Sequence, residues 1–395
     1  MIANASYVLN RNSVISEKSL KELQTTRKGS FDLLRIILIL MVCTLHACGR
    51  FDALFSEGAI PDAARYAGMA CESLSIVAVN TWVIMSGYLL VEKEFKLSRF
   101  LELLATVLFY AVLGFLIVFL LAGTKTPFAS PFADALSQVT NGGLFSYIQS
   151  MFPISAEYYW FMSCYLLLYI LTPLINAGAR ALSPKQFRLM LFLFLIWTSL
   201  IKSIIPVNFV TDDGGYGIKW FICLYLIGAY FRLEEIGSTG AKKSRLRPFE
   251  IYIGSVLLIY VISLVLYKIN LTDGSFAYFM TVPLHYNFVF TLTGACGLFL
   301  CFQNMELKNG LLQKAVTKLA PYTLGVYLLH GQPLLFYTWP VLTAAVLGTA
   351  PRENAGLFVL YIIETILILF VFGILADLLR SVIFSFFRKT VGKSR

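Results

Sequence analysis

The 395-residue sequence has few charged residues: Asp, Glu, Lys and Arg make up only 14% of it, whereas 58% of the residues are hydrophobic. A soluble domain typically carries about 25% charged residues. The mean hydropathy is +0.75, and apolar stretches recur along the whole chain. The composition therefore excludes an ordinary soluble domain and predicts an integral membrane protein. The net charge of +10 does not indicate nucleic-acid binding, because the basic residues are scattered over many loops.

Several chemical motifs are also missing. The seven cysteines lie in or beside apolar stretches and none belongs to a CxxC pair, which argues against a disulfide framework or a zinc site. The sequence has no nucleotide-binding loop, no G-x-S-x-G, no H-E-x-x-H and no cluster of metal ligands. We therefore expect no bound metal and no resident cofactor. The first 30 residues are polar, so we expect a cytoplasmic tail and no cleavable signal peptide.

Ten stretches are long and apolar enough to cross a bilayer, which takes about 20 residues of helix. The predicted fold is an all-α, polytopic membrane bundle with spans at 31–49, 68–91, 99–122, 158–176, 188–206, 217–232, 250–268, 281–302, 322–347 and 355–384. Pro333 and Pro340 interrupt the ninth span and predict a kink or a break there. The long connector 123–157 is typical of a lid or a binding element.

The basic residues orient these spans. Alternate loops, with the span ends next to them, place 24 Lys and Arg residues on one side and 7 on the other, and Arg35 lies within a span. Cytoplasmic loops carry the excess of Lys and Arg, so both termini are predicted to be cytoplasmic, in a multi-pass protein of the inner (plasma) membrane. The predicted organisation is a cytoplasmic tail at 1–30, a transmembrane domain at 31–385 and a basic cytoplasmic tail at 386–395.

Arg35 and His46 are the strongest candidates for chemistry. Eleven residues are almost three helical turns, so both side chains leave one face of the first span, roughly 16 Å apart along its axis. Ionisable groups within a span usually mark a functional site. Arg35 can hold an anion near the cytoplasmic end, and His46 suits a general base. The alternatives are that Arg35 snorkels to the headgroups and that His46 is a packing residue.

Other candidates each have a structural alternative. Asp32 either orients Arg35, three residues on, or caps the helix. Asn80 and Ser86, with Gly87, form either a polar stripe facing a ligand channel or a helix-packing surface. Glu157 and Trp160 open the fourth span, and they suit sugar contacts or an aromatic belt at the interface.

Polar and ionisable residues in or beside the later predicted spans are further candidates. Tyr327 and His330 lie in the ninth span, where His330 lines a channel or packs in the core. Asp212 and Asp213 are also typical of a solvated turn. Glu364 and Asp377 are acids in the last span without an evident partner. The role of His285 stays open.

Four of these segments together resemble a known family. Phe31-Asp-Leu-Leu-Arg35, followed by ten residues and His46, resembles the R-x10-H signature of membrane-bound acyltransferase family 3. Asn80–Tyr88 is similar to the family's second-span segment, Tyr158–Pro173 to its Tyr-x-Trp-Phe segment, and Tyr322–His330 to its Tyr-Leu-x-His segment. The resemblance covers about residues 30–385. Because only a short basic tail follows the last predicted span, we expect no extracytoplasmic esterase-like domain there, unlike in some fused members of the family.

The resemblance implies an O-acyltransferase that takes an acyl group, usually acetyl, from cytoplasmic acetyl-CoA as donor substrate. The implied acceptor is a hydroxyl of a surface polysaccharide or of a lipid-linked oligosaccharide, at a site among membrane lipids. Arg35 and His46 carry over as the functional pair, and His330 as a further family position. Arg35 would bind phosphate oxygens, a pantetheine arm of roughly 15–20 Å would reach His46, and Asn80 or Tyr327 would stabilise the oxyanion.

Two other functions compete with this one. A transporter or flippase of an anionic or glycan-bearing lipid would use Arg35 to bind phosphate, although the internal repeats common in transporters are not evident. A non-catalytic membrane scaffold would make both Arg35 and His46 dispensable.

Overall fold

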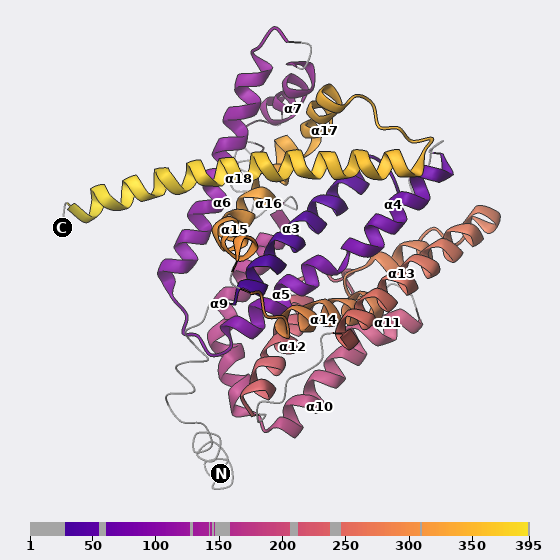
Figure 1. Ribbon diagram of the computed structural model, residues 1–395, viewed down its shortest axis with the longest axis vertical. Coiled ribbons are helices and arrows are strands. Elements are labelled where there is room, and N and C mark those ends of the chain that lie inside the picture. Colours follow the sequence, from indigo (N-terminus) through magenta and orange to yellow (C-terminus); the bar gives the residue numbers. More distant parts are fainter. Residues whose placement is uncertain are drawn as a thin grey trace.

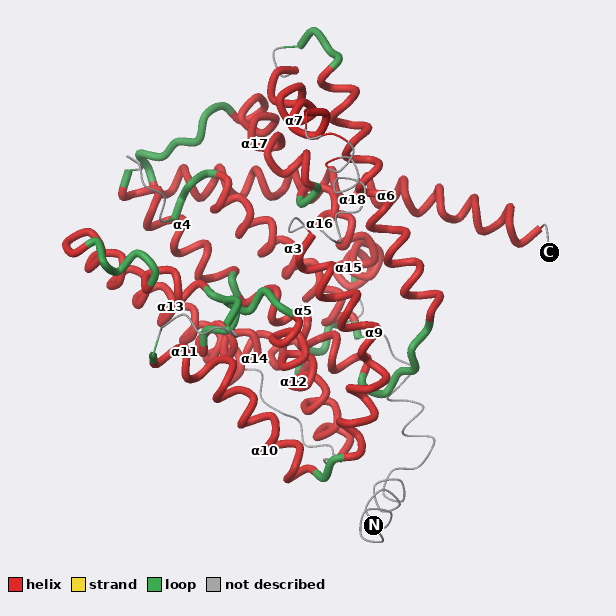
Figure 2. Tube along the Cα trace, turned by 180° about the vertical axis from the view of Figure 1, so that it is seen from behind, coloured by secondary structure: helices red, strands yellow, loops and turns green. Residues whose placement is uncertain are grey.

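The computed structural model describes residues 28–54, 61–126, 129–141, 143, 146, 159–205, 212–237, 246–308 and 310–393. Every secondary-structure element in these ranges is a helix, which confirms the predicted all-α class (Figure 1, Figure 2). Glu157 and most of the second half of the predicted connector 123–157, from residue 142 onward, lie outside the described residues. The described part of that connector contains one short helix, α7 (Ala129–Asn141), which packs on its neighbour α6 (Leu97–Ala122).

Each predicted span corresponds to a helical segment. Within the described ranges, eight segments are long and apolar enough to cross a membrane: α3 (Gly29–Arg50), α4 with α5 (Asp62–Leu90), α6, α9 (Trp160–Ala181), α10 to α11 (Pro184–Ile204), α13 (Leu246–Asp273), η3 with α14 (Phe279–Gln303) and α18 (Ala355–Phe386 of a helix that ends at Lys393). The predicted sixth span is the buried helix α12 (Ile218–Gly237), which is not one of the eight. The count of ten and the cytoplasmic termini remain predictions.

The predicted ninth span is broken, as its prolines indicated. Helix α16 (Thr323–His330) ends before Gly331, and α17 begins at Pro333 and ends at Leu347. The Gln332 side chain accepts hydrogen bonds from the backbone N–H groups of Leu334 and Leu335, at 2.8 and 2.9 Å. Such a cap satisfies amides that would otherwise be unpaired within the bundle. Pro340 lies inside α17, so the break occurs at the first proline alone.

Helix α3 lies between two apolar cores, and this places the candidate site at their boundary. Its residues Phe31, Leu34, Leu38 and Leu45 join the core formed with α5, α12 and α14, while Ile39, Cys43 and Ala47 join the core formed with α16 and α18. Both views show α3 running between α5 on one side and α16 and α18 on the other (Figure 1, Figure 2). Side chains that leave α3 along this boundary therefore face other helices rather than lipid.

Small residues let the helices of the first core approach closely. A Cβ at Gly87 of α5 would lie 2.0 Å from the Tyr225 carbonyl oxygen of α12, and a Cβ at Gly228 would lie 1.9 Å from the Ile84 oxygen. Without a hydrophobic driving force between helices in lipid, such close packing stabilises the bundle. Gly87 of the predicted polar stripe is therefore a packing residue.

Candidate active site

Arg35 and His46 both lie on α3, as the spacing predicted, and each faces a cavity inside the bundle. We call the end of α3 near Gly29 its inner end and the end near Arg50 its outer end. Arg35, near the inner end, donates from a guanidinium nitrogen to Asp32 Oδ1 at 2.9 Å, and the Asp32 side chain is almost fully buried. The helix begins at Gly29, so Asp32 lies beyond the capping position and orients Arg35 instead.

His46 contacts the third conspicuous residue of the sequence, His330. His46 Nδ1 lies 2.8 Å from His330 Nε2, although the two residues are 284 positions apart. His330 Nδ1 in turn lies in hydrogen-bonding contact with the Val326 carbonyl oxygen, one turn earlier on α16. The His46 ring also packs on Phe336 of α17 in a T-shaped arrangement, at 5.2 Å between ring centroids. The break between α16 and α17 thus lets a residue of each helix, His330 and Phe336, contact the His46 imidazole.

These contacts fix the tautomers of the neutral pair. A carbonyl oxygen can only accept, so His330 Nδ1 carries a proton and donates a hydrogen bond to the Val326 carbonyl oxygen. His330 Nε2 is then the acceptor, and His46 Nδ1 must carry the proton between the two rings. The remaining nitrogen, His46 Nε2, keeps its lone pair. Within the described part of the chain this nitrogen has no hydrogen-bond partner, so His46 keeps the acceptor that a general base needs, held in place by a partner that is itself held by the backbone.

A basic cavity opens at the inner end. We call it the inner cavity; its volume is about 680 Å³. Its lining includes Arg35 with Lys93, Lys96 and Arg99, against one acid, Glu94. Ser86 also lines it and donates to the Trp82 carbonyl oxygen at 3.0 Å. An excess of cations in a space of this size suits a polyanionic ligand.

A second and much smaller space surrounds His46. This acyl chamber, as we call it, has a volume of about 50 Å³ and is lined mainly by apolar and aromatic side chains. His46, Trp160, Tyr286 and Tyr327 line it together with Trp82, Phe161, Thr323 and Leu324, and the last four also line the inner cavity. The two spaces therefore adjoin, and the face of α3 that carries Arg35 and His46 runs along both.

The structure places some of the other predicted site residues at the acyl chamber and others in the packing between helices. Trp160 lines the acyl chamber and packs on Tyr286 and Tyr216, at centroid distances of 5.4 and 4.6 Å. The Tyr327 ring lies 6.4 Å from that of His46. Asn80 is fully buried; its amide donates to the Tyr286 carbonyl oxygen at 2.7 Å and accepts from Trp220 Nε1 at 2.9 Å. With both ends of its amide engaged, Asn80 links helices, and Tyr327 is the better placed of the two oxyanion candidates.

Two expectations for acidic residues change. Asp377 has partners after all: it accepts from Arg380 at 2.6 and 3.0 Å and from the Tyr110 hydroxyl at 2.9 Å. Asp212 is not part of a solvated turn, because its side chain is 8% exposed and forms an ion pair with the buried Lys202. The bond from Tyr110 to Asp377, and a bond from Asn287 to Asp212, join segments that are far apart in the sequence, and sequence patterns alone do not reveal such contacts.

Sequence reasoning also missed residues near the acyl chamber. Tyr286 lines it, but nothing in its local sequence distinguishes it from other aromatic residues. Glu72 on α4 is 8% exposed, and its Oε2 has no hydrogen-bond partner within the part of the chain that is described. The sequence does contain a signal that could have identified Glu72, because an acid within the predicted span 68–91 is unusual. No group of three or more His, Cys, Asp or Glu residues able to hold a metal occurs among the described residues.

Comparison with known proteins settles the family. No curated protein and no solved structure matches the chain. The model of one family, described as an acyltransferase domain, matches residues 28–379, which include both histidines, Arg35 and every helix that lines the two cavities. The chain belongs to acyltransferase family 3 and is a membrane acyltransferase.

Proposed function

We propose that the protein is an O-acetyltransferase that moves an acetyl group from acetyl-CoA to a hydroxyl of a cell-surface polysaccharide or of a lipid-linked sugar. The observation that carries this proposal is His46, with a free Nε2, in a small chamber that adjoins a large basic cavity. The arrangement offers a polyanion site and a general base along one helix face. The competing function, lipid transport, has no use for a base with a fixed tautomer.

The inner cavity suits the nucleotide end of the donor. Arg35, Lys93, Lys96 and Arg99 would bind the phosphate oxygens of CoA by charge-assisted hydrogen bonds. Asp32 holds the Arg35 guanidinium in a defined direction. Arg35 and His46 are roughly 16 Å apart along α3, which an extended pantetheine arm of roughly 15–20 Å can span. The thioester would then reach the acyl chamber past Trp82 and Phe161.

The size of the chamber supports a short acyl group. A space of about 50 Å³ holds roughly three to five water-sized groups. Acetyl has three heavy atoms and fits, whereas a long fatty acyl chain does not. The lining of Phe161, Trp82 and Trp160 also limits water, which protects a thioester from hydrolysis. These features favour acetyl over longer donors.

The transfer step follows from the tautomers. His46 Nε2 takes the proton from the acceptor hydroxyl while that oxygen bonds to the thioester carbonyl carbon. The charge that develops on His46 is delocalised over a ring whose Nδ1–H donates to His330. The tetrahedral intermediate then collapses: the C–S bond breaks, the CoA sulfur leaves as thiolate, and the imidazolium proton neutralises it. The Tyr327 hydroxyl is the candidate donor to the oxyanion.

The test measures transfer directly. His46→Ala should lower acetyl transfer from labelled acetyl-CoA to glycan in isolated membranes by about 10²- to 10⁴-fold, the usual contribution of a general base. Thr44→Ala is the matched control, because Thr44 lies on the same helix and, among the described residues, its hydroxyl bonds to the Leu40 carbonyl oxygen one turn earlier and to no other group. Acetate on the purified glycan is quantified by NMR. Transfer that survives His46→Ala at the level of the control would remove the proposed chemistry.

A further inference from the structure

A second polar cavity lies on the side of the bundle where α10 (Pro184–Leu195) continues into the π-helical turn η2 (Ile196–Leu200) and α11 (Ile201–Ile204). We call it the outer pocket; its volume is about 180 Å³. Its lining includes the indoles of Trp197 and Trp220 together with Lys202, Asp212 and Asn287. Nothing in the reaction described above uses these residues. π-helical turns interrupt regular helices and often occur at functional sites.

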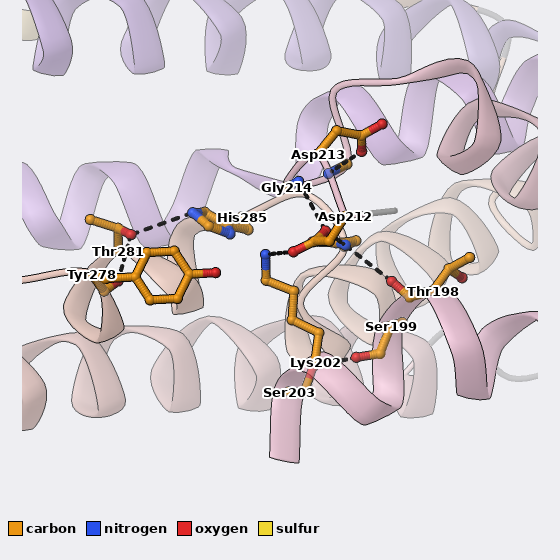
Figure 3. Close-up of polar contacts among 12 residues, drawn as sticks. Thr198, Ser199, Lys202, Ser203, Asp212, Asp213, Gly214, Tyr278, Thr281 and His285 are labelled. Atoms are coloured by element: carbon orange, nitrogen blue, oxygen red, sulfur yellow. Dashed lines mark hydrogen bonds and ion pairs between the residues drawn. The ribbon is translucent and has the colours of Figure 1, made fainter. Parts of the chain in front are cut away.

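The outer pocket is built around a buried ion pair. The side chains of Lys202 and Asp212 are only 3% and 8% exposed, and the ammonium donates to the carboxylate. Figure 3 shows Lys202 directed at Asp212, between Thr198 and the pair Tyr278 and His285. Asp212 also accepts from Asn287 Nδ2 at 2.8 Å and from the Gly214 N–H at 3.0 Å. Burial raises the pKa of the Asp212 carboxyl, but these hydrogen bonds outweigh it and hold the pKa below its ordinary value.

One lining group of the outer pocket lacks a partner. Asn287 is 5% exposed, and its Nδ2 donates to the Thr198 carbonyl oxygen as well as to Asp212. Its Oδ1 accepts no hydrogen bond from any described residue. Buried acceptors are rarely left unsatisfied. Because Asn287 lines the pocket, a hydroxyl or amide donor of a bound ligand can satisfy this oxygen.

The charges of the outer pocket point to a neutral ligand. Lys202 is balanced by Asp212, and at the rim Lys219 lies 3.5 Å from Asp213. A pocket with balanced charges has no net field to select an anion such as a phosphate. Indole surfaces combined with fixed donors and acceptors suit a sugar ring, which has apolar C–H faces and hydroxyls that both donate and accept.

Two consecutive residues line the acyl chamber and the outer pocket, one in each. Tyr286 lines the acyl chamber, and Asn287 lines the outer pocket. Asn80 reinforces this junction, because its amide bonds to both Trp220 and the Tyr286 carbonyl oxygen. A chain of two or more sugars can therefore place one ring in the outer pocket while a neighbouring ring presents its hydroxyl to His46. We infer that the outer pocket is a second acceptor subsite for a neutral sugar, so that the acceptor is an oligosaccharide or polymer rather than a single sugar. This inference rests on the proposed O-acetyltransferase function.

The experiment compares two acceptors on the purified full-length protein in nanodiscs. The probes are size-fractionated neutral oligosaccharides released from the surface glycan of the cells that carry the protein, and the monosaccharides obtained by hydrolysing them. Trp197 is 67% exposed, so Trp197→Ala removes one wall of the pocket with little effect on folding. Phe192→Ala is the matched control: Phe192 lies on the preceding helix, is 58% exposed and does not line the pocket.

The expected result is a change in KM for one acceptor only. Wild-type protein should prefer the oligosaccharide, and Trp197→Ala should raise its KM roughly 3- to 10-fold, the range for loss of one aromatic contact, with kcat and monosaccharide kinetics unchanged. Trp197→Phe should recover part of the loss. Equal use of both acceptors by the wild type, or an unchanged oligosaccharide KM in Trp197→Ala, would overturn the subsite.

A binding measurement separates this inference from the proposed chemistry. Saturation-transfer NMR in the absence of acetyl-CoA should detect oligosaccharide binding to the wild type and to His46→Ala, but weaker binding to Trp197→Ala. If binding behaves so while no variant transfers acetyl, the outer pocket is a sugar site and the transferase proposal fails. If transfer depends on His46 while binding ignores Trp197, the transferase proposal stands and the subsite fails.

Discussion

His330 provides the sharpest test of the histidine pair. The structure assigns it as a positioning residue: its Nε2 accepts a hydrogen bond from His46 Nδ1–H at 2.8 Å, and its Nδ1–H is held by the Val326 carbonyl oxygen. In the ground state this is a hydrogen bond between neutral groups. As His46 takes the substrate proton, its Nδ1–H becomes part of a cation, and hydrogen bonds to charged groups contribute about 1.5–3 kcal/mol. Each 1.36 kcal/mol of barrier corresponds to a tenfold change in rate.

His330→Ala should therefore lower kcat by about 10- to 160-fold and leave the KM for acetyl-CoA unchanged. His330→Gln should restore most of the rate, because the Gln carbonyl oxygen can take the place of Nε2 as an acceptor although it cannot act as a base. The double variant His46→Ala, His330→Ala should be no slower than His46→Ala alone, since both residues act as one unit.

The assay is the initial rate of acetyl transfer by purified variants at saturating donor, with KM measured for donor and acceptor separately. Gel filtration in detergent checks that each variant is folded. Three results would refute the reasoning: His330→Ala as fast as the wild type, His330→Gln as slow as His330→Ala, or single-variant effects that multiply in the double variant. Multiplied effects would mean that His330 acts on its own, as a second base or a substrate contact.

Three further predictions follow from the cavities and the ion pair. Arg35→Ala should raise the KM for acetyl-CoA about tenfold or more with kcat nearly unchanged. Arg35→Lys should recover only part of this affinity, because lysine lacks the forked geometry of a guanidinium. Initial rates against donor concentration measure both constants, and a fall in kcat at constant KM would contradict the prediction. Val42→Ala enlarges the acyl chamber by two carbon atoms, so the rates with propionyl- and butyryl-CoA should rise relative to the rate with acetyl-CoA. Val83 is buried outside the chamber, so Val83→Ala should leave this donor preference unchanged. Competition between donors, followed by mass spectrometry of the glycan, measures the preference. Asp212→Asn should lower the free energy of unfolding by about 3 kcal/mol near pH 7, because it leaves Lys202 buried without its counter-charge. The folded-state pKa of Asp212 is depressed. Its contribution to the free energy of unfolding is therefore fully present above the unfolded-state pKa of about 4 and is lost as the pH falls below that value. The difference in Tm between wild type and Asp212→Asn should shrink below about pH 4, and a constant difference would refute the stabilising role of the Asp212 carboxylate.

Local physics determined much of this protein from the sequence. Hydropathy and helix length are properties of contiguous residues, so the all-α membrane fold followed from composition and span length alone. The shared face of Arg35 and His46 followed from helical periodicity, and the break before Pro333 followed from the missing amide of proline. The order of these segments was also enough to identify the family.

Only the tertiary structure decided which distant groups meet. The contact between His46 and His330, the hydrogen bond from Asn287 to Asp212, and the double engagement of Asn80 all join segments whose separation in the sequence carries no information about their packing. The cavities are likewise what remains between packed helices, so no single helix encodes them. Periodicity could assign a residue to a face of its own helix, but only the packing of the other helices decided whether that face meets lipid, a neighbour or a space large enough for a substrate.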